Sequence, residues 1–368
     1  MQIAIDAHHI GDRRTGTETY VYNLVKQLAL LEPNGDKYAI YVSSPRCVGD
    51  LGSNPRFERR TVPSFSTAVR YSLFYPLQSW RKRFDLFHAQ FSLPPFLRSR
   101  SVLTVHDLSF ERFPEFFRRS IAAQMKVLVP WSCRRADHII TVSESSKRDL
   151  VELYRLNPER ITVTYEGAAE NYCPAASDRA LDRLRQSYGI AAPFILCVGN
   201  LEPRKNLGRL LVAFAELKQK KRISHKLVIV GQKAWLYDDI FRTIRERSLD
   251  GEIVLTGYVP AKDLPFFYNA ASLFVYPSLF EGFGLPVVEA MACGTPVVTS
   301  FGSSLEEISS GAAVLIDPRS VSSLAAAIEK VANNVELQRT LGQAGLARAA
   351  SFSFRKMAEQ TRAVYHRI

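Results

Sequence analysis

Short apolar runs alternate with stretches of helical periodicity through the first half of the chain. Seven of these runs have the length and the β-branched or aromatic content of strands: 2–7, 38–43, 57–62, 85–90, 101–108, 138–143 and 161–167. Apolar residues at helical spacing predict helices at about 18–31 and 116–136 between them. This alternation predicts a parallel, doubly wound sheet.

The same rhythm returns in the second half, after an interruption at 168–191. Six further runs read as strands, at 194–200, 226–232, 252–258, 272–277, 296–300 and 313–317, and helices are expected at about 320–333, 335–349 and 352–367. We therefore expect an α/β protein with two Rossmann-like domains, 1–172 and 190–350, joined by a linker at 173–189. Open α/β sheets bind ligands at the carboxyl ends of their strands, so the two domains should face each other across a ligand-binding cleft.

Composition agrees with this division. A chain of 368 residues is long enough for two domains, and 46% hydrophobic with 23% charged residues is typical of a globular protein. No apolar run reaches the roughly 18 residues that span a bilayer, and the first residues lack the pattern of a signal peptide. The five cysteines are scattered and form no C-x-x-C pair, which favours reduced thiols in a cytoplasmic protein and no metal site.

Positive charge is concentrated in one segment. The net charge is +12, and residues 56–135 carry fifteen Lys/Arg against five Asp/Glu, which leaves only +2 for the remainder. Such a segment implies an anionic partner: a membrane surface, nucleic acid or a phosphorylated substrate. It contains an aromatic stretch, 65–83, with Phe65, Tyr71, Phe74, Tyr75 and Trp80. These aromatics fit either a peripheral membrane contact or the core of the first domain.

Residues 277–298, PSLFEGFGLPVVEAMACGTPVV, carry the strongest chemical signal. A loop rich in Gly and Pro leads into a helix of small and apolar residues, with Glu281 in the loop and Glu289 on the helix. A helix start offers backbone N–H groups and a positive dipole end, which suit a phosphate. Two solvated acids are the alternative, but Gly282 and Gly284 beside Glu281 indicate a backbone that something must approach closely.

A second group of candidates follows the first strand of the second half, in VGNLEPRKNL (198–207). Arg204 and Lys205 stand together before an amphipathic helix. Adjacent cations at such a turn are suited to clamp a diphosphate, although two exposed loop charges would give the same pattern. In the first half, Gly16 occupies a comparable turn, in a loop that lacks the G-x-G-x-x-G fingerprint.

Three histidines follow strands of the first half: His8, His9 and His106, the last paired with Asp107. Their placement alone does not choose among them, and a structural role is the common one for a lone histidine. Asp137 and His138 begin a strand and are interpreted as structural. The motifs G-x-S-x-G, G-x-x-x-x-G-K-[ST] and H-E-x-x-H are all missing, so hydrolase, P-loop and zincin functions have no support.

The stretch EGFGLPVVEAMACGTPVV, preceded by FVYPS and joined to VGNLEPRKNL, resembles the retaining glycosyltransferases of family four, which have the GT-B fold. The resemblance extends from the first strand to SFSFRKMAEQTRAVY at the C-terminus, and it implies that the helix at 352–368 crosses back onto the first domain. Two departures stand out. Gly16 to Tyr20 lack the second glycine and the arginine of the family's Gly-x-Gly-Arg-Tyr loop, and Phe354 replaces a common tryptophan.

The resemblance implies a role for each candidate. Glu281 would contact hydroxyls of the donor sugar, and Glu289 the ribose hydroxyls of the nucleotide. The cations at 204 and 205 would neutralise the leaving diphosphate, and His106 would lie beside the donor sugar, as in the family's mannosyltransferases. The remaining donor-binding positions are backbone groups at Gly16, Gly199, Phe283, Gly284 and Leu285. No cofactor is implied besides the nucleotide sugar, which acts as a co-substrate.

The expected reaction is metal-independent transfer of a hexosyl group, with GDP-mannose the preferred donor, to a lipid-linked or growing glycan. No residue stands out as a carboxylate nucleophile of the kind that retaining glycosidases use. The resemblance to the family instead implies same-face attack, in which the leaving phosphate accepts the proton of the acceptor. A sugar-nucleotide epimerase is the main alternative, while a phosphorylase would need a pyridoxal-phosphate lysine that the sequence does not reveal. Nucleic-acid binding through the basic segment lacks a recognised reader module and is not expected. An inner-face, peripheral membrane location would suit a lipid-linked acceptor.

Overall fold

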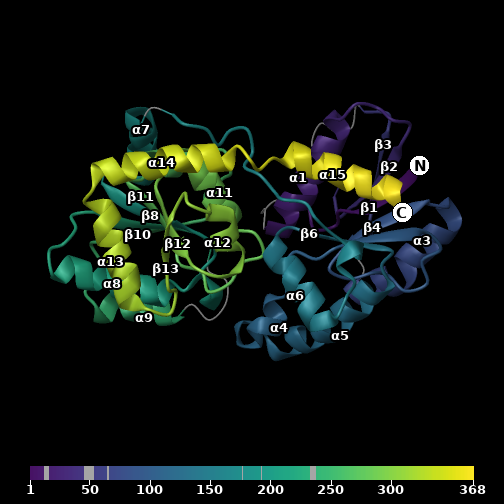
Figure 1. Cartoon of the computed structure of the whole chain (residues 1–368), viewed down its shortest axis with the longest axis horizontal. Coiled ribbons are helices and arrows are strands. Elements are labelled where there is room, and N and C mark those ends of the chain that lie inside the picture. Colours follow the sequence, from purple (N-terminus) through teal and green to yellow (C-terminus); the bar gives the residue numbers. More distant parts are fainter. Residues whose placement is uncertain (12–15, 45–53, 64–65, 176, 192, 233–237) are drawn as a thin grey trace. The chain divides into compact units, whose positions relative to one another are not determined.

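The computed structural model describes the chain except residues 12–15, 45–53, 64–65, 176, 192 and 233–237 (Figure 1). The chain divides into two compact units. Unit 1 comprises Met1–Glu166 together with Ser353–Ile368, and unit 2 comprises Gly167–Phe352. Each unit is an α/β domain built on one parallel sheet, so the fold class that the alternation predicted is confirmed.

Seven parallel strands form the sheet of unit 1, in the order β3-β2-β1-β4-β5-β6-β7. Their bounds are β1 Gln2–Asp6, β2 Lys37–Val42, β3 Phe57–Thr61, β4 Leu86–Gln90, β5 Arg100–Thr104, β6 His138–Thr141 and β7 Ile161–Val163. Every residue of β4 is buried, as expected for a central strand that helices cover on both faces. All seven strands match the predicted runs.

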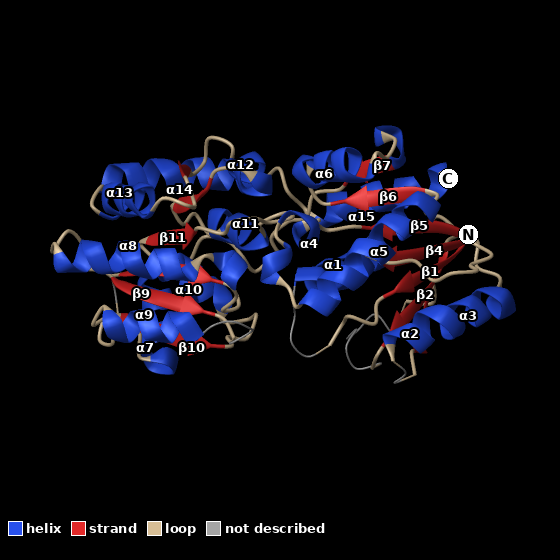
Figure 2. Ribbon diagram, turned by 90° about the horizontal axis from the view of Figure 1, so that it is seen from below, coloured by secondary structure: helices blue, strands red, loops and turns tan. Residues whose placement is uncertain are grey.

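Helices cover both faces of this sheet (Figures 1 and 2). On one face α1 (Gly16–Leu30) packs against the C-terminal helix α15 (Phe354–Arg367). On the other face a single hydrophobic cluster joins the strands to α3, α4, α5 and α6. The helical segments on that side are α2 Thr67–Val69, a π-helical turn Arg70–Phe74, α3 Tyr75–Lys82, α4 Ser109–Arg112, α5 Arg119–Arg135 and α6 Glu144–Tyr154.

Helix α15 is tied to unit 1 by polar contacts near the end of the chain. The hydroxyl of Tyr365 lies 2.6 Å from Nδ1 of His88, inside the sheet, and both side chains are buried. Nε2 of His366 lies 2.8 Å from a carboxylate oxygen of Asp36. The chain therefore leaves unit 2 after Phe352 and ends within unit 1.

The sheet of unit 2 has six parallel strands in the order β10-β9-β8-β11-β12-β13. They are β8 Phe194–Val198, β9 Lys226–Val230, β10 Ile253–Gly257, β11 Leu273–Tyr276, β12 Val297–Ser300 and β13 Val314–Ile316. The helices are α8 Leu207–Gln219, α9 Asp238–Glu246, α10 Leu264–Ala270, α11 Leu285–Ala292, α12 Ser303–Ser309, α13 Val321–Ala332 and α14 Val335–Ala349. Strands β8 and β11 are neighbours, so the turns that follow them meet at the same edge of the sheet.

The segment 173–189, expected to be a linker, is part of unit 2, and unit 1 ends at Glu166 rather than at 172. The segment contains α7 (Ser177–Tyr188), and Ala180 and Leu184 of this helix are buried in the core of unit 2. The hydroxyl of Tyr188 also donates to Asp263, at 3.0 Å. Leu181 and Tyr188 pack partly buried against the same core, while the other described positions of the helix are polar, and for that reason its composition resembles that of a linker.

The two interpretations of the aromatic stretch 65–83 divide by residue. Tyr71 and Tyr75 are core residues whose hydroxyls donate to Asp6 at 2.7 and 2.6 Å, and Phe74 packs partly buried against the same cluster. Trp80 is exposed. Phe65, like Cys47, lies outside the described residues. No helix in the described part of the chain is long and apolar enough to cross a membrane.

Candidate functional site

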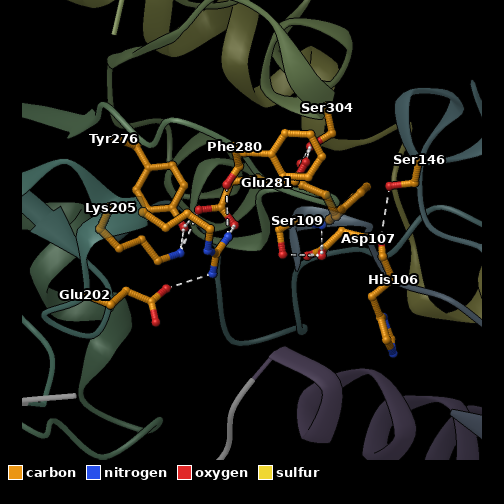
Figure 3. Close-up of polar contacts among 12 residues, drawn as sticks. His106, Asp107, Ser109, Ser146, Glu202, Lys205, Tyr276, Phe280, Glu281 and Ser304 are labelled. Atoms are coloured by element: carbon orange, nitrogen blue, oxygen red, sulfur yellow. Dashed lines mark hydrogen bonds and ion pairs between the residues drawn. The ribbon is translucent and has the colours of Figure 1, made fainter. Parts of the chain in front are cut away.

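Glu281, Arg204 and Lys205 form one ion cluster at the carboxyl edge of the unit 2 sheet (Figure 3). One carboxylate oxygen of Glu281 lies 2.6 Å from Nη1 of Arg204, and the other lies 2.7 Å from Nζ of Lys205. The cations follow β8 and the acid follows β11, so the pairing of these two strands brings them together. The sequence motifs at 198–207 and 277–298 thus form a single site.

Two further side chains complete this cluster. The hydroxyl of Tyr276, the last residue of β11, lies 2.6 Å from Nζ of Lys205 and 3.0 Å from Glu281. Glu202 accepts from Nη2 of Arg204 at 2.8 Å. With these bonds Lys205 uses two of the three N–H donors of its ammonium group. The site therefore combines two cations with two acids.

The cluster keeps Glu281 ionised. Burial raises the pKa of the Glu281 carboxyl, but the charges of Arg204 and Lys205 and their hydrogen bonds outweigh burial and lower it to about 2. The pKa of Tyr276 is raised well above its usual range by burial and by the neighbouring carboxylate. At neutral pH the site thus holds a carboxylate, two cations and a neutral phenol.

Hydrogen bonds to the backbone shape the loop that carries Glu281. The hydroxyl of Ser304, on α12, donates to the carbonyl oxygens of Glu281 and Phe283 at 2.8 and 2.9 Å (Figure 3). The amide of Asn206 donates to the carbonyls of Pro277 and Pro318 at 3.0 and 2.6 Å. Asn206 adopts the left-handed conformation, with φ 58°, which asparagine tolerates better than most residues. These bonds fix the loop that carries Glu281 relative to the turn that carries Arg204 and Lys205.

The loop enters α11 through a glycine that no other residue replaces easily. Gly284 has φ 103°, and a Cβ built on it would lie only 2.6 Å from Cδ2 of Leu305. The side chain of Phe283 is buried and packs edge-on against Phe352, so the chain offers its backbone rather than a side chain here. The predicted use of the N–H groups from Phe283 to Leu285 in donor binding stays a prediction.

Gly199 lies directly beside Lys205. It has φ 152°, and a Cβ there would approach Cε of Lys205 to 3.2 Å. A side chain at this position would displace the lysine stem, so the glycine makes room for the cation. Its predicted contact with the donor phosphates is untested.

Glu289, eight positions after Glu281, has very different neighbours. It lies on α11, and its carboxylate accepts from the hydroxyl of Tyr268 at 2.8 Å. Burial raises the pKa of Glu289 to about 7, only partly opposed by hydrogen bonds from Tyr268 and Tyr172. No cation is paired with this acid among the ion pairs of the described residues. Near neutral pH Glu289 thus exists as a mixture of the acid and the carboxylate.

In unit 1, His106 lies just beyond β5 in an uncharged setting. Its Nε2 lies 3.0 Å from Oε1 of Gln90, and the ring of Tyr20 packs edge-on against it at 4.8 Å. Burial lowers the pKa of His106 to about 3, so the ring is neutral under ordinary conditions. Because Gln90 offers an oxygen, Nε2 carries the proton and Nδ1 is left as an acceptor. A neutral acceptor suits a sugar hydroxyl.

The other two histidines after a strand of unit 1 belong to a network around Asp6. Nδ1 of His8 lies 2.6 Å from Asp6, and the rings of His8 and His9 are 3.8 Å apart. Burial lowers the pKa of His9 to about 4. Burial raises the pKa of Asp6, but His8 and the hydroxyls of Tyr71 and Tyr75 lower it well below its usual range. Asp6 and His8 therefore serve the local structure at the end of β1.

Gly16 begins α1, and among the described residues no atom lies within 4 Å of a Cβ built on it. Packing therefore does not account for this glycine, and its predicted contact with phosphates is untested. The loop departs from the family pattern at Glu18, which is buried and accepts from the N–H of Gly11. Where the family's loop has its second glycine, this chain has Glu18, which forms a hydrogen bond within the same loop.

The structure thus joins three predicted site residues, Glu281, Arg204 and Lys205, and places Glu289 on the helix that follows them. His106 and Gly16 belong to unit 1. Sequence reasoning missed five supporting side chains: Glu202, Asn206, Tyr268, Tyr276 and Ser304. Glu202 and Asn206 flank the cations and were readable as an acid beside Arg204 and a helix-start asparagine. Tyr268, Tyr276 and Ser304 carried no local signal.

Comparisons with known proteins agree with the family that the sequence motifs resemble. Residues 182–348 match the model for glycosyl transferases group 1, and residues 14–170 match the model for glycosyltransferase family 4. O-antigen chain mannosyltransferase B of Escherichia coli is 34% identical over 296 residues, which is 79% of this chain and 77% of that protein. Two solved structures share the fold at low identity. Sucrose-phosphate synthase from Thermosynechococcus elongatus superposes with a TM-score of 0.80 at 21% identity, covering 100% of this chain and 98% of the other. The Anabaena protein HepE in complex with UDP-glucose gives 0.76 at 19%, covering 100% of both.

Two Rossmann-like sheets with a C-terminal helix returned to the first unit, together with these superpositions, define the GT-B class of glycosyltransferases. The chain belongs to the glycosyltransferases of group 1 and family 4, and its relatives include mannosyltransferases of O-antigen synthesis.

Proposed function

We propose that the enzyme transfers a mannosyl group, with retention, from a nucleotide diphosphate sugar to a lipid-linked or growing glycan. The ion cluster of Glu281, Arg204 and Lys205 carries this proposal, because it combines cations for a diphosphate with a carboxylate for sugar hydroxyls. The resemblance to O-antigen chain mannosyltransferase B supports mannose as the sugar and a bacterial surface glycan as the product class. GDP-mannose is the proposed donor.

Arg204 and Lys205 bind the diphosphate in this proposal. A guanidinium forms paired hydrogen bonds with phosphate oxygens, while an ammonium acts as a compact charge with rotatable donors. The start of α11 adds N–H groups and a positive dipole end. Both cations are paired with carboxylates, so an arriving diphosphate competes with Glu281 and Glu202 for them. With two side-chain cations present, we propose that transfer needs no metal ion.

The two glutamates bind different parts of the donor. Glu281, held ionised by its cations, accepts from hydroxyls of the sugar ring. Glu289 accepts from the ribose hydroxyls. His106, neutral and with Nδ1 as an acceptor, binds a further sugar hydroxyl and contributes to the preference for mannose.

The reaction itself is a same-face displacement. The bond between the anomeric carbon and the phosphate oxygen breaks, and the bonding pair remains on the diphosphate. The acceptor hydroxyl attacks from the same face, and its proton passes to the leaving phosphate oxygen. Negative charge therefore builds on the diphosphate, where preorganised Arg204 and Lys205 stabilise it most as the bond breaks. The proposal assigns no nucleophilic role to Glu281, whose carboxylate pairs with Arg204 and Lys205.

A thermal-shift screen against GDP-, UDP-, ADP- and dTDP-sugars tests the donor. A true donor stabilises the folded protein by mass action, by about 2.7 kcal/mol at a hundred times its Kd. We expect the largest shift with GDP-mannose, followed by transfer to a lipid-linked oligosaccharide acceptor with an α-linked product and full activity in EDTA. If only a sugar nucleotide with another base stabilised the protein, that sugar nucleotide would replace GDP-mannose as the proposed donor. Consumption of the donor without acceptor, giving an epimerised sugar nucleotide, would overturn the transferase proposal.

A further inference from the structure

One face of unit 1 exposes large apolar side chains to solvent. On the segment that ends in α3 they are Val69, Leu73, Leu77 and Trp80, and on α5 they are Ile121, Val127, Leu128 and Trp131. Phe96, in the loop between β4 and β5, is 70% exposed. We call these nine residues the α3–α5 surface. Both helical sets are stripes: 69, 73, 77 and 80 follow helical spacing, as do 121, 128 and 131.

The two stripes lie on the same side of the sheet. The inward residues of both helical segments, Tyr71 and Tyr75 on one and Val129 and Cys133 on the other, belong to a single core cluster. Their outward residues therefore project from the same face of unit 1. In Figure 1, α5 lies on the side of the sheet opposite α1 and α15.

The loop 91–99 fills the space between the stripes. The indole N–H of Trp80 donates to the carbonyl of Phe96 at 3.0 Å, which ties this loop to α3. The N–H of Leu93 donates to the hydroxyl of Ser132 at 3.0 Å, which ties the same loop to α5. The loop that carries Phe96 is thus bonded to both helices and connects the two stripes.

Phe96 adopts a backbone conformation that is unfavourable for its side chain. Its φ is 58°, in the left-handed region that bulky residues rarely occupy. At 70% exposure, the ring gains little from the core in return. Strain without internal compensation is typical of a residue that is kept for an external partner.

Cations surround the apolar stripes. Exposed basic residues stand at the ends of both helices and in the loop: Arg81, Lys82, Arg83, Arg98, Arg118, Arg119, Arg134 and Arg135. The guanidinium of Arg98 lies 4.8 Å from the ring centre of Trp80, and that of Arg135 lies 5.1 Å from that of Trp131. Each tryptophan therefore pairs an apolar ring with a positive charge, the combination that favours an anionic bilayer interface.

We propose that the α3–α5 surface docks unit 1 onto an anionic lipid bilayer. Basic residues outnumber acidic ones fifteen to five over residues 56–135, and this positive balance fits a lipid headgroup layer better than a second copy of the same basic surface. Aliphatic residues such as Leu73, Val127 and Leu128 enter the acyl boundary of a bilayer, but they cannot stack on bases as a nucleic-acid site requires. The partner is therefore a membrane.

This docking leaves the chemistry of unit 1 accessible. Trp80 and Trp131 lie in the last turns of α3 and α5, and the chain then enters β4 and β6. The tryptophans thus lie near the amino edge of the sheet, whereas His106 follows β5 at the carboxyl edge. Membrane docking adds a location to the proposed transfer reaction and does not depend on it.

Vesicle flotation with the full chain tests the surface. We expect binding to vesicles of phosphatidylcholine with 30% phosphatidylglycerol at low salt, and little binding to pure phosphatidylcholine or in high salt. Arg81→Glu with Lys82→Glu should weaken binding at least about tenfold, and Phe96→Ser about fivefold. The matched controls are Lys220→Glu with Lys221→Glu in unit 2, and Leu30→Ser, which is 62% exposed on α1 across the sheet.

A spectroscopic measurement checks which residues enter the lipid. The chain has three tryptophans, at 80, 131 and 235, so the Trp235→Phe variant leaves the two of the proposed surface as reporters. Brominated phosphatidylglycerol should quench their emission, and Trp131→Phe should remove about half of the quenching.

Several outcomes would overturn the proposal. They are binding without dependence on anionic lipid, unchanged binding of the Phe96 variant, and loss of self-association rather than of vesicle binding in the variants. Tight duplex binding that the same variants abolish would also overturn it. Transfer to a water-soluble acceptor is measured in parallel, so failure of docking with intact transfer contradicts only the membrane surface.

Discussion

Glu281 and Glu289 are both buried acids of the same loop–helix segment, yet their surroundings are opposite. Two cations lower the pKa of Glu281 to about 2, whereas burial beside tyrosine hydroxyls raises that of Glu289 to about 7. Eight residues of chain therefore separate a fixed negative charge from an acid that titrates near neutrality. A fixed charge matches a group that meets the reacting sugar and its diphosphate. An acid with only hydroxyl partners matches neutral ligand hydroxyls.

The largest expected effect on turnover comes from replacing Lys205, one of the two cations paired with Glu281. Lys205→Met keeps most of the aliphatic stem beside Gly199 but removes the charge that stabilises the leaving diphosphate. We expect turnover to fall about 1,000-fold, the loss seen when one preorganised charge-stabilising donor is removed. Steady-state kinetics with the identified donor measures this.

Lys218→Met is the matched control, because Nζ of Lys218 also lies 2.8 Å from an acid, Glu252, away from the site. It should leave turnover within a few-fold of the wild type. Near-normal rates in the Lys205 variant would remove this lysine from the catalytic group.

Next in size is the effect of neutralising Glu281. Glu281→Gln keeps the shape but frees Arg204 and Lys205 from their carboxylate. Turnover should fall about 100-fold because the sugar loses its charged acceptor. Binding of the nucleoside diphosphate should at the same time tighten, since the phosphate no longer competes with the acid. Calorimetric titration separates the two effects, and weaker diphosphate binding would contradict the competition.

A pH profile examines the other acid. The pKa of Glu289 is about 7 in the folded protein, against 4.5 ordinarily, so the folded state keeps a proton that the unfolded state releases. The free energy of unfolding should therefore decrease as pH rises from about 4.5 to 7. Glu289→Gln has no proton to lose and should remove this part of the slope. Thermal unfolding from pH 5 to 8 measures the difference.

Donor affinity should depend on the same titration of Glu289, but it should increase as pH rises, whereas the free energy of unfolding decreases. Ribose hydroxyls donate more strongly to a carboxylate than to a neutral acid. We expect wild-type donor affinity to increase about threefold to tenfold from pH 6 to pH 8, and Glu289→Gln to bind weakly and without this trend. An unchanged trend in the variant would assign the titration to another group. Glu216→Gln, on the exposed part of α8, is the control.

The smallest effect is expected at Tyr268. Its hydroxyl donates to Glu289 at 2.8 Å, so Tyr268→Phe should raise the pKa of this acid further. KM for the donor should increase about threefold at pH 7 with kcat unchanged, and the pH midpoint of binding should move upward. Tyr188→Phe removes a comparable hydroxyl bond, to Asp263, and should leave both unchanged. A change in kcat alone would contradict a positioning role.

Most strands were predictable because they are short apolar runs bounded by polar turns, the pattern that a parallel sheet covered on both faces requires; the edge strand β3, FERRT, is the polar exception. The meeting of 198–207 with 277–298 followed from both being turns after strands. The role of α7 was not predictable, because only a few apolar residues of this polar helix, Ala180, Leu181 and Leu184 among them, pack it against unit 2. Nor was the split of the aromatic stretch: Tyr75 and Trp80 are five residues apart, and only the helix orientation makes one core and the other exposed.

The supporting side chains of the site illustrate the same limit. Ser304 lies 23 residues from Glu281, and Tyr268 lies 21 residues from Glu289. No local pattern indicates which serine or tyrosine of a buried element will reach a given loop, because the packing of α12 and α10 decides it. The chemistry of a site is therefore more readable from sequence than the hydrogen bonds that hold it.

The central claim is that Arg204 and Lys205 hold the donor's diphosphate. A thermodynamic cycle tests it most directly: the affinities of the wild type and of Lys205→Met for a nucleoside diphosphate and for the matching monophosphate, measured by calorimetric titration. The account predicts that the variant loses at least about tenfold in diphosphate affinity, the size of one charged hydrogen bond, and nearly nothing for the monophosphate. An equal loss for both ligands, or none for the diphosphate, would contradict it.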